Sequence, residues 1–245
     1  MDKLIYLAAQ AAKGTMSRQE NIANNLANVN TPGFRQQLMA FQSAPVVGEG
    51  SGSRSYAIET SVGFDTTPGQ IQATGRDLDV AIQGDGWFAV TAADGNEAYT
   101  RNGSFQIDGG GNLVTQEGYT VVGTGGPINV PPDHRVTVEG NGTISAVPLS
   151  GENNVVQLGA LKLVNLQAPD IVRGDDGLFR SKTQGEVAAD PAVRVASGFI
   201  EGSNVNAVDM MVQMITAARQ YETQMKMISS AEDNGRAANS LLGLN

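Results

Sequence analysis

The 245-residue chain contains no cysteine, so it can form neither a disulfide bond nor a metal site built on cysteine ligands. Its single histidine, His134, is the one place where a Ser-His-Asp arrangement could be assembled, and the preceding Pro-Pro-Asp stretch predicts an exposed loop there. No apolar run approaches the roughly 18 residues that a membrane-spanning helix requires. We therefore expect no catalytic site, no metal, no cofactor and no small-molecule substrate.

Charged residues are also few, at 17% of the chain, and the formal net charge is -9. Residues 1–45 hold four basic and two acidic side chains, whereas residues 200–245 hold three basic and five acidic ones. The opposite signs of the two ends mildly favour their association. The remaining excess of acid lies in the middle of the chain, which argues against binding to nucleic acid or to an anionic membrane.

The first 29 residues show the spacing of an amphipathic helix. Proline disfavours helix at the residue before it and Pro-Gly suits the centre of a type II turn, so Asn30, Thr31, Pro32 and Gly33 predict the end of this helix, with Gly33 at positive φ. A buried core helix would show a similar stripe. The stripe steps by four and three residues through Met1, Ile5, Ala8, Ala12, Thr15, Gln19, Ile22, Leu26 and Val29.

A second helix is predicted from Ala207 onward, with Asn206 as its N-cap. Five methionines lie between Met210 and Met227, and their flexible thioether side chains suit an interface that fits several neighbours. Methionine that merely fills gaps in a core is the alternative. The expected stripe runs through Ala207, Met211, Met214, Ala218, Tyr221, Met225 and Ile228.

Between the helices, short alternating runs separated by glycine turns predict an antiparallel β domain, either a sandwich or a partly open barrel. Strands are expected at 78–82, 87–91, 113–115 and 56–64, and a hairpin at Asn141-Gly142 pairs Val136 and Val138 with Ile144 and Ala146. Asn102-Gly103 predicts another tight turn. Residues 48–55 have the composition of a Gly/Ser-rich loop.

Acidic residues in this region suggest two further hypotheses. The turn Asp108–Asn112 superficially resembles a calcium loop, although a hairpin turn explains it equally well. Asp77, Asp79 and Asp85 could supply an acid/base pair for glycoside hydrolysis. Asp77 and Asp79 lie on one strand face roughly 7 Å apart, but solvated outer-face carboxylates are the commoner cause of this spacing.

Four long stretches resemble the bacterial flagellar rod and hook proteins, in the order expected of that family. They are NIANNLANVNTPGFR at 21–35, GRDLDVAIQGDGWFAV at 75–90, YTRNGSFQIDGGGNLVTQEGYTVVG at 99–123 and GFIEGSNVNAVDMMVQMITAARQYE at 198–222. The opening MDKLIY and the chain length are most similar to the proximal-rod members, and the distal-rod paralogue is the alternative.

The resemblance implies a structural subunit of the basal-body rod, which polymerises axially through its terminal helices and transmits torque to the hook and filament. It also implies contacts with proximal and distal rod subunits and with the flagellar type III export apparatus, export without a cleaved signal peptide, and a location in the rod that spans the periplasm. A secreted β-sandwich module that binds or hydrolyses a glycan is the less favoured hypothesis.

These observations predict an α+β fold in which the N- and C-terminal helices form a coiled-coil-like hairpin and a mainly antiparallel β domain is inserted between them. The expected domains are 1–35 with 199–245 (inner axial domain), 36–76 (connecting extended or β region) and 77–198 (β domain), and we expect protease-sensitive ends around a resistant core at 76–197. The expected assembly residues are Ile5, Ala8, Ala12, Ile22, Leu26, Val29, Ala207, Met211, Met214, Ala218, Tyr221, Met225 and Ile228.

Overall fold

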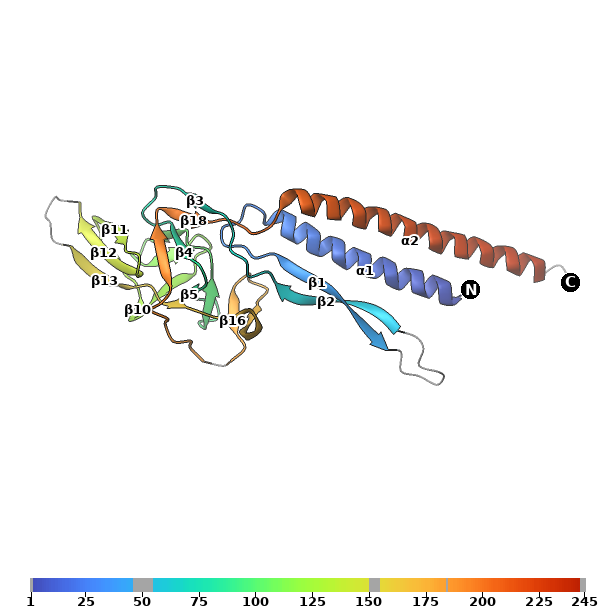
Figure 1. Cartoon of the computed structure of the whole chain (residues 1–245), viewed down its shortest axis with the longest axis horizontal. Helices are drawn as coiled ribbons and strands as arrows, with labels where there is room; N and C mark the ends of the chain where they lie inside the picture. The colour runs from blue at the N-terminus through green and yellow to red at the C-terminus, as the bar shows by residue number, and fades with distance from the viewer. Residues whose placement is uncertain (1, 46–54, 150–154, 184, 243–245) are drawn as a thin grey trace. The chain divides into compact units, whose positions relative to one another are not determined.

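The computed structural model describes residues 2–45, 55–149, 155–183 and 185–242. The fold is α+β, with an N-terminal helix, a mainly antiparallel β domain and a C-terminal helix, as predicted (Figure 1). The chain divides into two compact units. The helical unit comprises residues 1–28, 37–62 and 205–245, and the β unit comprises residues 29–36 and 63–204.

The helical unit contains α1 (Asp2–Ala27) and α2 (Ala207–Leu242), which lie side by side and antiparallel (Figure 1). Asn206 caps α2 as predicted, because its Oδ1 accepts hydrogen bonds from the amides of Val208 (3.0 Å) and Asp209 (3.3 Å). The unit also holds most of a two-stranded hairpin made of β1 (Gln37–Pro45) and β2 (Ser55–Phe64). Strand β2 was predicted and β1 was not; most of the Gly/Ser-rich stretch at 48–55 lies outside the described residues.

The predicted turn after α1 is confirmed, and Gly33 has a φ of +69°. A Cβ at this position would come within 3.0 Å of backbone atoms of both Arg101 and Asn102. The Gly33 amide donates to the carbonyl oxygen of Glu201 at 2.8 Å. Glycine is therefore needed both for the backbone conformation and for the close approach of another chain segment.

The β unit is built from short strands, and every strand pair within it is antiparallel. Its largest sheet has the order β15-β16-β6-β5-β9-β8-β7, with β10 paired to β9 and β14 to β5. A three-stranded sheet β11-β12-β13 and the pairs β17-β4 and β18-β3 complete it. The elements are β3 (Ile71–Ala73), β4 (Val80–Gln83), β5 (Trp87–Thr91), β6 (Glu97–Thr100), β7 (Phe105–Ile107), β8 (Leu113–Thr115), β9 (Thr120–Gly123), β10 (Gly126–Pro127), β11 (His134–Val138), β12 (Thr143–Pro148), β13 (Val156–Ala160), β14 (Leu163–Val164), the 3₁₀ helix η1 (Ala168–Asp170), β15 (Ile171–Arg173), β16 (Phe179–Ser181), β17 (Arg194–Ser197) and β18 (Phe199–Glu201).

The predicted hairpin register is confirmed: Val136 pairs with Ala146, and Val138 pairs with Ile144. Alternating valine and isoleucine on these strands place apolar side chains in the main core. That core also takes Phe88 from the central strand β5.

Two local predictions were wrong. Gly103 is not in a positive-φ hairpin turn; a Cβ there would overlap the carbonyl oxygen of Val80, so glycine serves a close chain crossing. Asp79 is buried rather than solvated, and its Oδ1 accepts a hydrogen bond from Arg76 Nη2 at 2.5 Å. The conformation of Gly103 and the burial of Asp79 both depend on tertiary contacts, and local turn and strand patterns do not encode such contacts.

Candidate functional site

The buried stripe of α1 follows the predicted spacing through most of its length, with one polar exception. Asn25 is buried where the prediction had Leu26, which is half-buried. Asn25 Nδ2 donates to the carbonyl oxygen of Gln37 (3.0 Å) and Asn25 Oδ1 accepts from the Gln37 amide (2.8 Å), so this side chain holds the first residue of β1 against the helix. The buried residues of α1 are Ala8, Ala12, Thr15, Ile22 and Asn25.

Every second residue of the observed α2 stripe lies one position before the residue that was predicted. Met211, Ala218 and Met225 lie beside the stripe, and its members are the residues one place before them. The two neighbouring pairs Met210-Met211 and Ala217-Ala218 make both phases equally apolar at those two positions. The buried and half-buried residues of the stripe are Ala207, Met210, Met214, Ala217, Tyr221, Gln224, Ile228 and Ala231.

Small side chains let α1 and α2 approach closely, and a hydrogen bond joins them. Gln224 Nε2 donates to Thr15 Oγ1 at 3.0 Å, and Thr15 Oγ1 in turn donates to the carbonyl oxygen of Ala11. This bond accounts for the phase of α2, because it places Gln224 rather than Met225 against α1. This polar contact between the two helices favours one register over the others.

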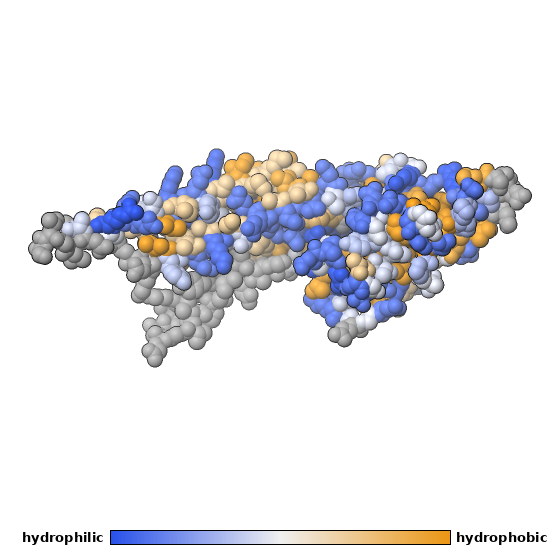
Figure 2. Space-filling model, turned by 180° about the vertical axis from the view of Figure 1, so that it is seen from behind, coloured by the Kyte–Doolittle hydropathy of each residue, from blue (hydrophilic) through white to orange (hydrophobic). Residues whose placement is uncertain are grey.

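The side of α2 that α1 does not cover is apolar near its N-terminal end. Met211 is 52% exposed, and Val208, Val212 and Ile215 are exposed with it on the first turns of the helix. Farther along α2, Met225 is also exposed. Figure 2 shows apolar surface along the helical unit. Soluble monomers rarely leave contiguous apolar surface open to water, so this side of α2 is the candidate interaction surface.

Some predicted assembly residues are therefore exposed to solvent, and others pack within the helical unit. Met211 and Met225 are accessible, whereas Ala8, Ala12 and Ile22 are already buried within the helical unit. The half-buried residues are Ile5, Leu26, Val29, Ala207, Met214, Ala218, Tyr221 and Ile228. Participation of these residues in subunit contacts stays a prediction.

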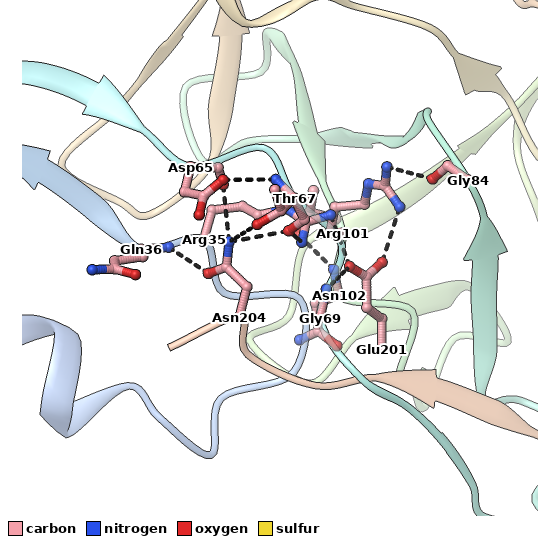
Figure 3. A network of polar contacts seen from close by, with 11 residues as sticks. Arg35, Gln36, Asp65, Thr67, Gly69, Gly84, Arg101, Asn102, Glu201 and Asn204 are labelled. Atoms are coloured by element: carbon pink, nitrogen blue, oxygen red, sulfur yellow. Dashed lines mark hydrogen bonds and ion pairs between the residues drawn. The ribbon is translucent and has the colours of Figure 1, made fainter. Parts of the chain in front are cut away.

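A second feature is a buried ionic network in the β unit, centred on Glu201 at the end of β18 (Figure 3). Its Oε1 lies 2.7 Å from Arg35 Nη2 and accepts a hydrogen bond from the Gly69 amide at 2.9 Å. Its Oε2 accepts from Arg101 Nη1, also at 2.9 Å. All three charged side chains are at most 2% exposed.

Further polar bonds connect the same segments (Figure 3). Arg35 Nη1 donates to the carbonyl oxygen of Thr67 (2.6 Å), and Arg101 Nη2 donates to that of Gly84 (2.8 Å). Asn204 Oδ1 accepts from the Gln36 amide at 2.7 Å, while its Nδ2 donates to the Thr67 carbonyl at 3.0 Å. The turn after α1 and the segment before α2 are therefore both held in the β unit.

The electrostatics of this network are those of two cations sharing one anion. Burial lowers the pKa of Arg35 and of Arg101, and the charge of Glu201 opposes the shift at both. Asp85 acts on both guanidinium groups in the same sense as Glu201. Because arginine stays protonated in proteins, Glu201 is the main compensation for two buried positive charges. Sequence reasoning missed this network because its members lie far apart in the chain.

The acidic residues considered as a hydrolytic pair do not form one. Asp77 is paired with Arg135, and a hydrogen bond from that arginine lowers the pKa of Asp77. Burial raises the pKa of Asp79, but hydrogen bonds from Arg76, Thr74 and Ser104 outweigh it and leave that pKa below its usual value. A glycosidase acid needs a raised pKa, so this geometry does not support one.

The remaining candidate sites have structural explanations. Asp108 Oδ1 accepts from the amides of Gly110 and Asn112, both at 2.8 Å, which stabilises the hairpin between β7 and β8. His134 Nδ1 lies 2.7 Å from the carbonyl oxygen of Pro132. Across the described parts of the chain, no group of three or more His, Cys, Asp or Glu side chains could hold a metal ion. Within the same ranges, no helix has the length and apolar character needed to cross a membrane.

Three protein-family descriptions match this chain. "Flagella basal body rod protein" matches residues 5–35, "Flagellar hook protein FlgE/F/G D1 domain" matches residues 81–146, and "Flagellar basal body rod FlgEFG protein C-terminal" matches residues 196–241. The first covers most of α1 and its turn, the third covers most of α2, and the second covers part of the β unit.

Whole-length relatives are also found. The flagellar basal-body rod proteins FlgF of Escherichia coli and Salmonella typhimurium are 49% and 47% identical to this chain, each over the full length of both proteins. The flagellar basal-body rod protein FlgG of Agrobacterium fabrum is 34% identical, over 94% of this chain and 96% of its own length.

Proposed function

The chain belongs to the flagellar basal-body rod protein family and is a structural component of the rod, and we propose that it polymerises axially through the uncovered face of α2. The FlgF proteins of Escherichia coli and Salmonella typhimurium match at higher identity than FlgG of Agrobacterium fabrum, which favours the proximal-rod member of the family over the distal-rod paralogue. In this role the subunit forms part of the periplasm-spanning shaft that transmits torque. Its partners are neighbouring rod subunits and, before assembly, the flagellar type III export apparatus.

The proposal includes a coiled-coil-like hairpin of α1 and α2. Its support is the three-and-four spacing of the buried residues on both helices, together with the bond from Gln224 to Thr15. A long antiparallel pair of this kind presents two broad sides to its surroundings. Repeated contacts between different sides of identical subunits do not close on themselves and so build a helical filament.

The observation that carries the proposal is the exposed apolar side of α2. Burying one valine, isoleucine or methionine side chain contributes about 1.5–3 kcal/mol, so covering Val208, Met211, Val212 and Ile215 would provide a substantial part of a subunit contact. Within the helical unit α1 leaves these residues open to solvent. In a polymer, a neighbouring subunit would bury these residues.

The proposal is tested with Met211→Asp and Met225→Asp, each in the full chain. A carboxylate buried at a subunit contact without a partner is strongly unfavourable, so we expect loss of assembled rods and of swimming. Both residues are exposed in the single chain, so the thermal unfolding of the β unit should be unchanged. Asn24→Asp, at an exposed polar position of α1, is the matched control and should assemble normally. Normal rods from both methionine variants would contradict the proposal.

A further inference from the structure

An open groove of about 710 Å³ lies between α1 and α2 within the helical unit. Threonine and glutamine side chains make up much of its lining, and its two charged residues are Arg18 on α1 and Arg219 on α2. No acidic residue lines it. The groove therefore combines hydrogen-bonding capacity with an excess of positive charge.

Two details indicate that the groove receives another chain. Gln224 Oε1 is buried without a hydrogen-bond partner among the described residues, while the Nε2 of the same side chain is bound to Thr15. A buried acceptor of this kind calls for an incoming donor. Gly14 also lines the groove, although glycine is unfavourable inside a helix, and its missing side chain leaves room for close approach.

A surface of opposite charge lies near the other end of α2. Glu232 and Asp233 are adjacent and exposed, and Arg236 forms long ion pairs with them, at 3.9 Å to Glu232 and 3.6 Å to Asp233. Asp233 follows Ile215 by five helical turns and therefore lies on the same side of α2 as the exposed apolar residues. At about 100° per residue, it points roughly 140° away from Gln220 in the groove. Arg219, fourteen residues before Asp233, points only about 40° away from it, so the arginine edge of the groove lies on the same side of α2 as Asp233, and Gln220 lies on another side.

We propose that the groove receives the Glu232–Asp233 turn of a second copy of this chain. The carboxylates would face Arg18 and Arg219, and Arg236, one turn beyond Glu232, would offer a donor to Gln224 Oε1. Thirteen residues separate Gln220 from Asp233, so parallel copies would be offset by roughly 20 Å along α2. This inference rests on the proposed function and specifies its partner and its stagger. The contact joins two different surfaces, so it repeats without closing.

Charge reversal tests the pairing. We expect Arg18→Glu with Arg219→Glu, and separately Glu232→Lys with Asp233→Lys, to yield at least about tenfold fewer assembled rods, because each places like charges face to face. The chain with all four substitutions restores opposite signs and should recover assembly. Normal rods from either pair would overturn the proposal, as would a four-substitution chain that melts like the parent and still fails to assemble.

Disulfide cross-linking tests the proposed position of the second copy. Because the chain has no native cysteine, only the introduced cysteines of this chain can form the disulfide bond. Thr216→Cys lies in the groove, and Ser229→Cys lies one turn before Asp233. The two positions are about 20 Å apart along one helix, too far for a disulfide within one chain, so any bond joins two copies. Oxidised basal bodies with both substitutions should give a ladder of linked subunits, and each single substitution should not. Normal rods without a ladder, or with linked dimers alone, would overturn the proposal.

The outcomes separate this inference from the proposed function. If Met211→Asp blocks assembly while the charge-reversed and double-cysteine chains behave like the parent, the groove is not the site and axial polymerisation through α2 stands. If Met211→Asp and Met225→Asp assemble normally as well, the proposed function fails together with the inference.

Discussion

Glu201 is the residue on which the β unit most depends electrostatically. Its carboxylate faces Arg35, which follows the turn after α1, and Arg101, which follows β6. Burying three charges costs desolvation free energy, and this cost is offset only while every member has its partners. The network therefore tolerates loss of the carboxylate much less well than an exposed ion pair would.

Glu201→Gln should lower the free energy of unfolding of the β unit by about 3–5 kcal/mol, because it leaves two buried guanidinium groups without their main counter-charge. Urea unfolding followed by the fluorescence of Trp87, the single tryptophan, measures this directly. Glu186→Gln is the control, since that side chain is 82% exposed. A loss no larger than that of the control would show that Glu201 does not have this role.

Two features require glycine at position 33: its positive φ, and the close approach of another backbone segment. Gly33→Val should destabilise the β unit by more than about 1 kcal/mol, because φ is positive and the added Cβ meets the backbone at Arg101 and Asn102. Gly118→Val measures the cost of positive φ alone, because Gly118 also has positive φ but a Cβ there meets nothing within 4 Å. The same urea experiment compares them. Equal losses would mean that the close approach at Gly33 contributes nothing.

Residues whose role is local were predictable from sequence, and residues whose role is distant were not. The Pro32-Gly33 turn, the Asn206 cap and the Asn141-Gly142 hairpin depend on a few neighbouring residues, and the structure confirms each one. The partners of Glu201 lie 166 and 100 residues away, and no spacing rule connects them. Asp79 was misjudged for a similar reason, because Ser104 helps to hold it in the interior.

At the scale of the elements, the contact between α1 and α2 shows what periodicity can and cannot decide. The sequence indicated two amphipathic helices and most of the stripe on α1. On α2, adjacent methionines and adjacent alanines left two phases equally apolar at those positions, and the Gln224–Thr15 bond belongs to only one of them. Apolar residues are expected in a helix–helix seam, so the sequence pattern favoured the phase that places Met225, rather than Gln224, against α1.

Substitutions at two neighbouring alanines test this phase. Ala217 is buried in the seam, so Ala217→Leu should overpack it and destabilise the helical unit by about 1–3 kcal/mol. Ala218, which the sequence favoured, lies beside the seam, and Ala218→Leu should cost clearly less. Far-ultraviolet circular dichroism during thermal unfolding of the full chain compares the two. A larger loss for Ala218→Leu would support the phase expected from sequence.

At the scale of the whole molecule, the two units divide the chain differently from its order in sequence. Residues 29–36 and 63–75 belong to the β unit, together with the segment up to Asn204. The buried contacts of Glu201 and the bonds of Asn204 hold this segment in place. The sequence suggested a resistant core at 76–197, which omits these residues.

Limited proteolysis of the free chain should therefore leave a resistant fragment whose C-terminal boundary lies after Asn204. Cutting should concentrate within α2, where one face of the helix is open to protease. Mass spectrometry of the fragments locates the boundary. A stable fragment that ends near Ser197 would show that the Glu201 network does not protect the segment before α2.

The central claim is that neighbouring subunits cover the exposed side of α2 in the rod, and thiol labelling of Met211→Cys tests it most directly. The chain has no native cysteine, so every label reports this one position. In the free chain the thiol should react readily, because Met211 is 52% exposed. In isolated basal bodies the account predicts strong protection, which denaturation should abolish. Equal labelling of the free chain and the assembled rod would contradict the account.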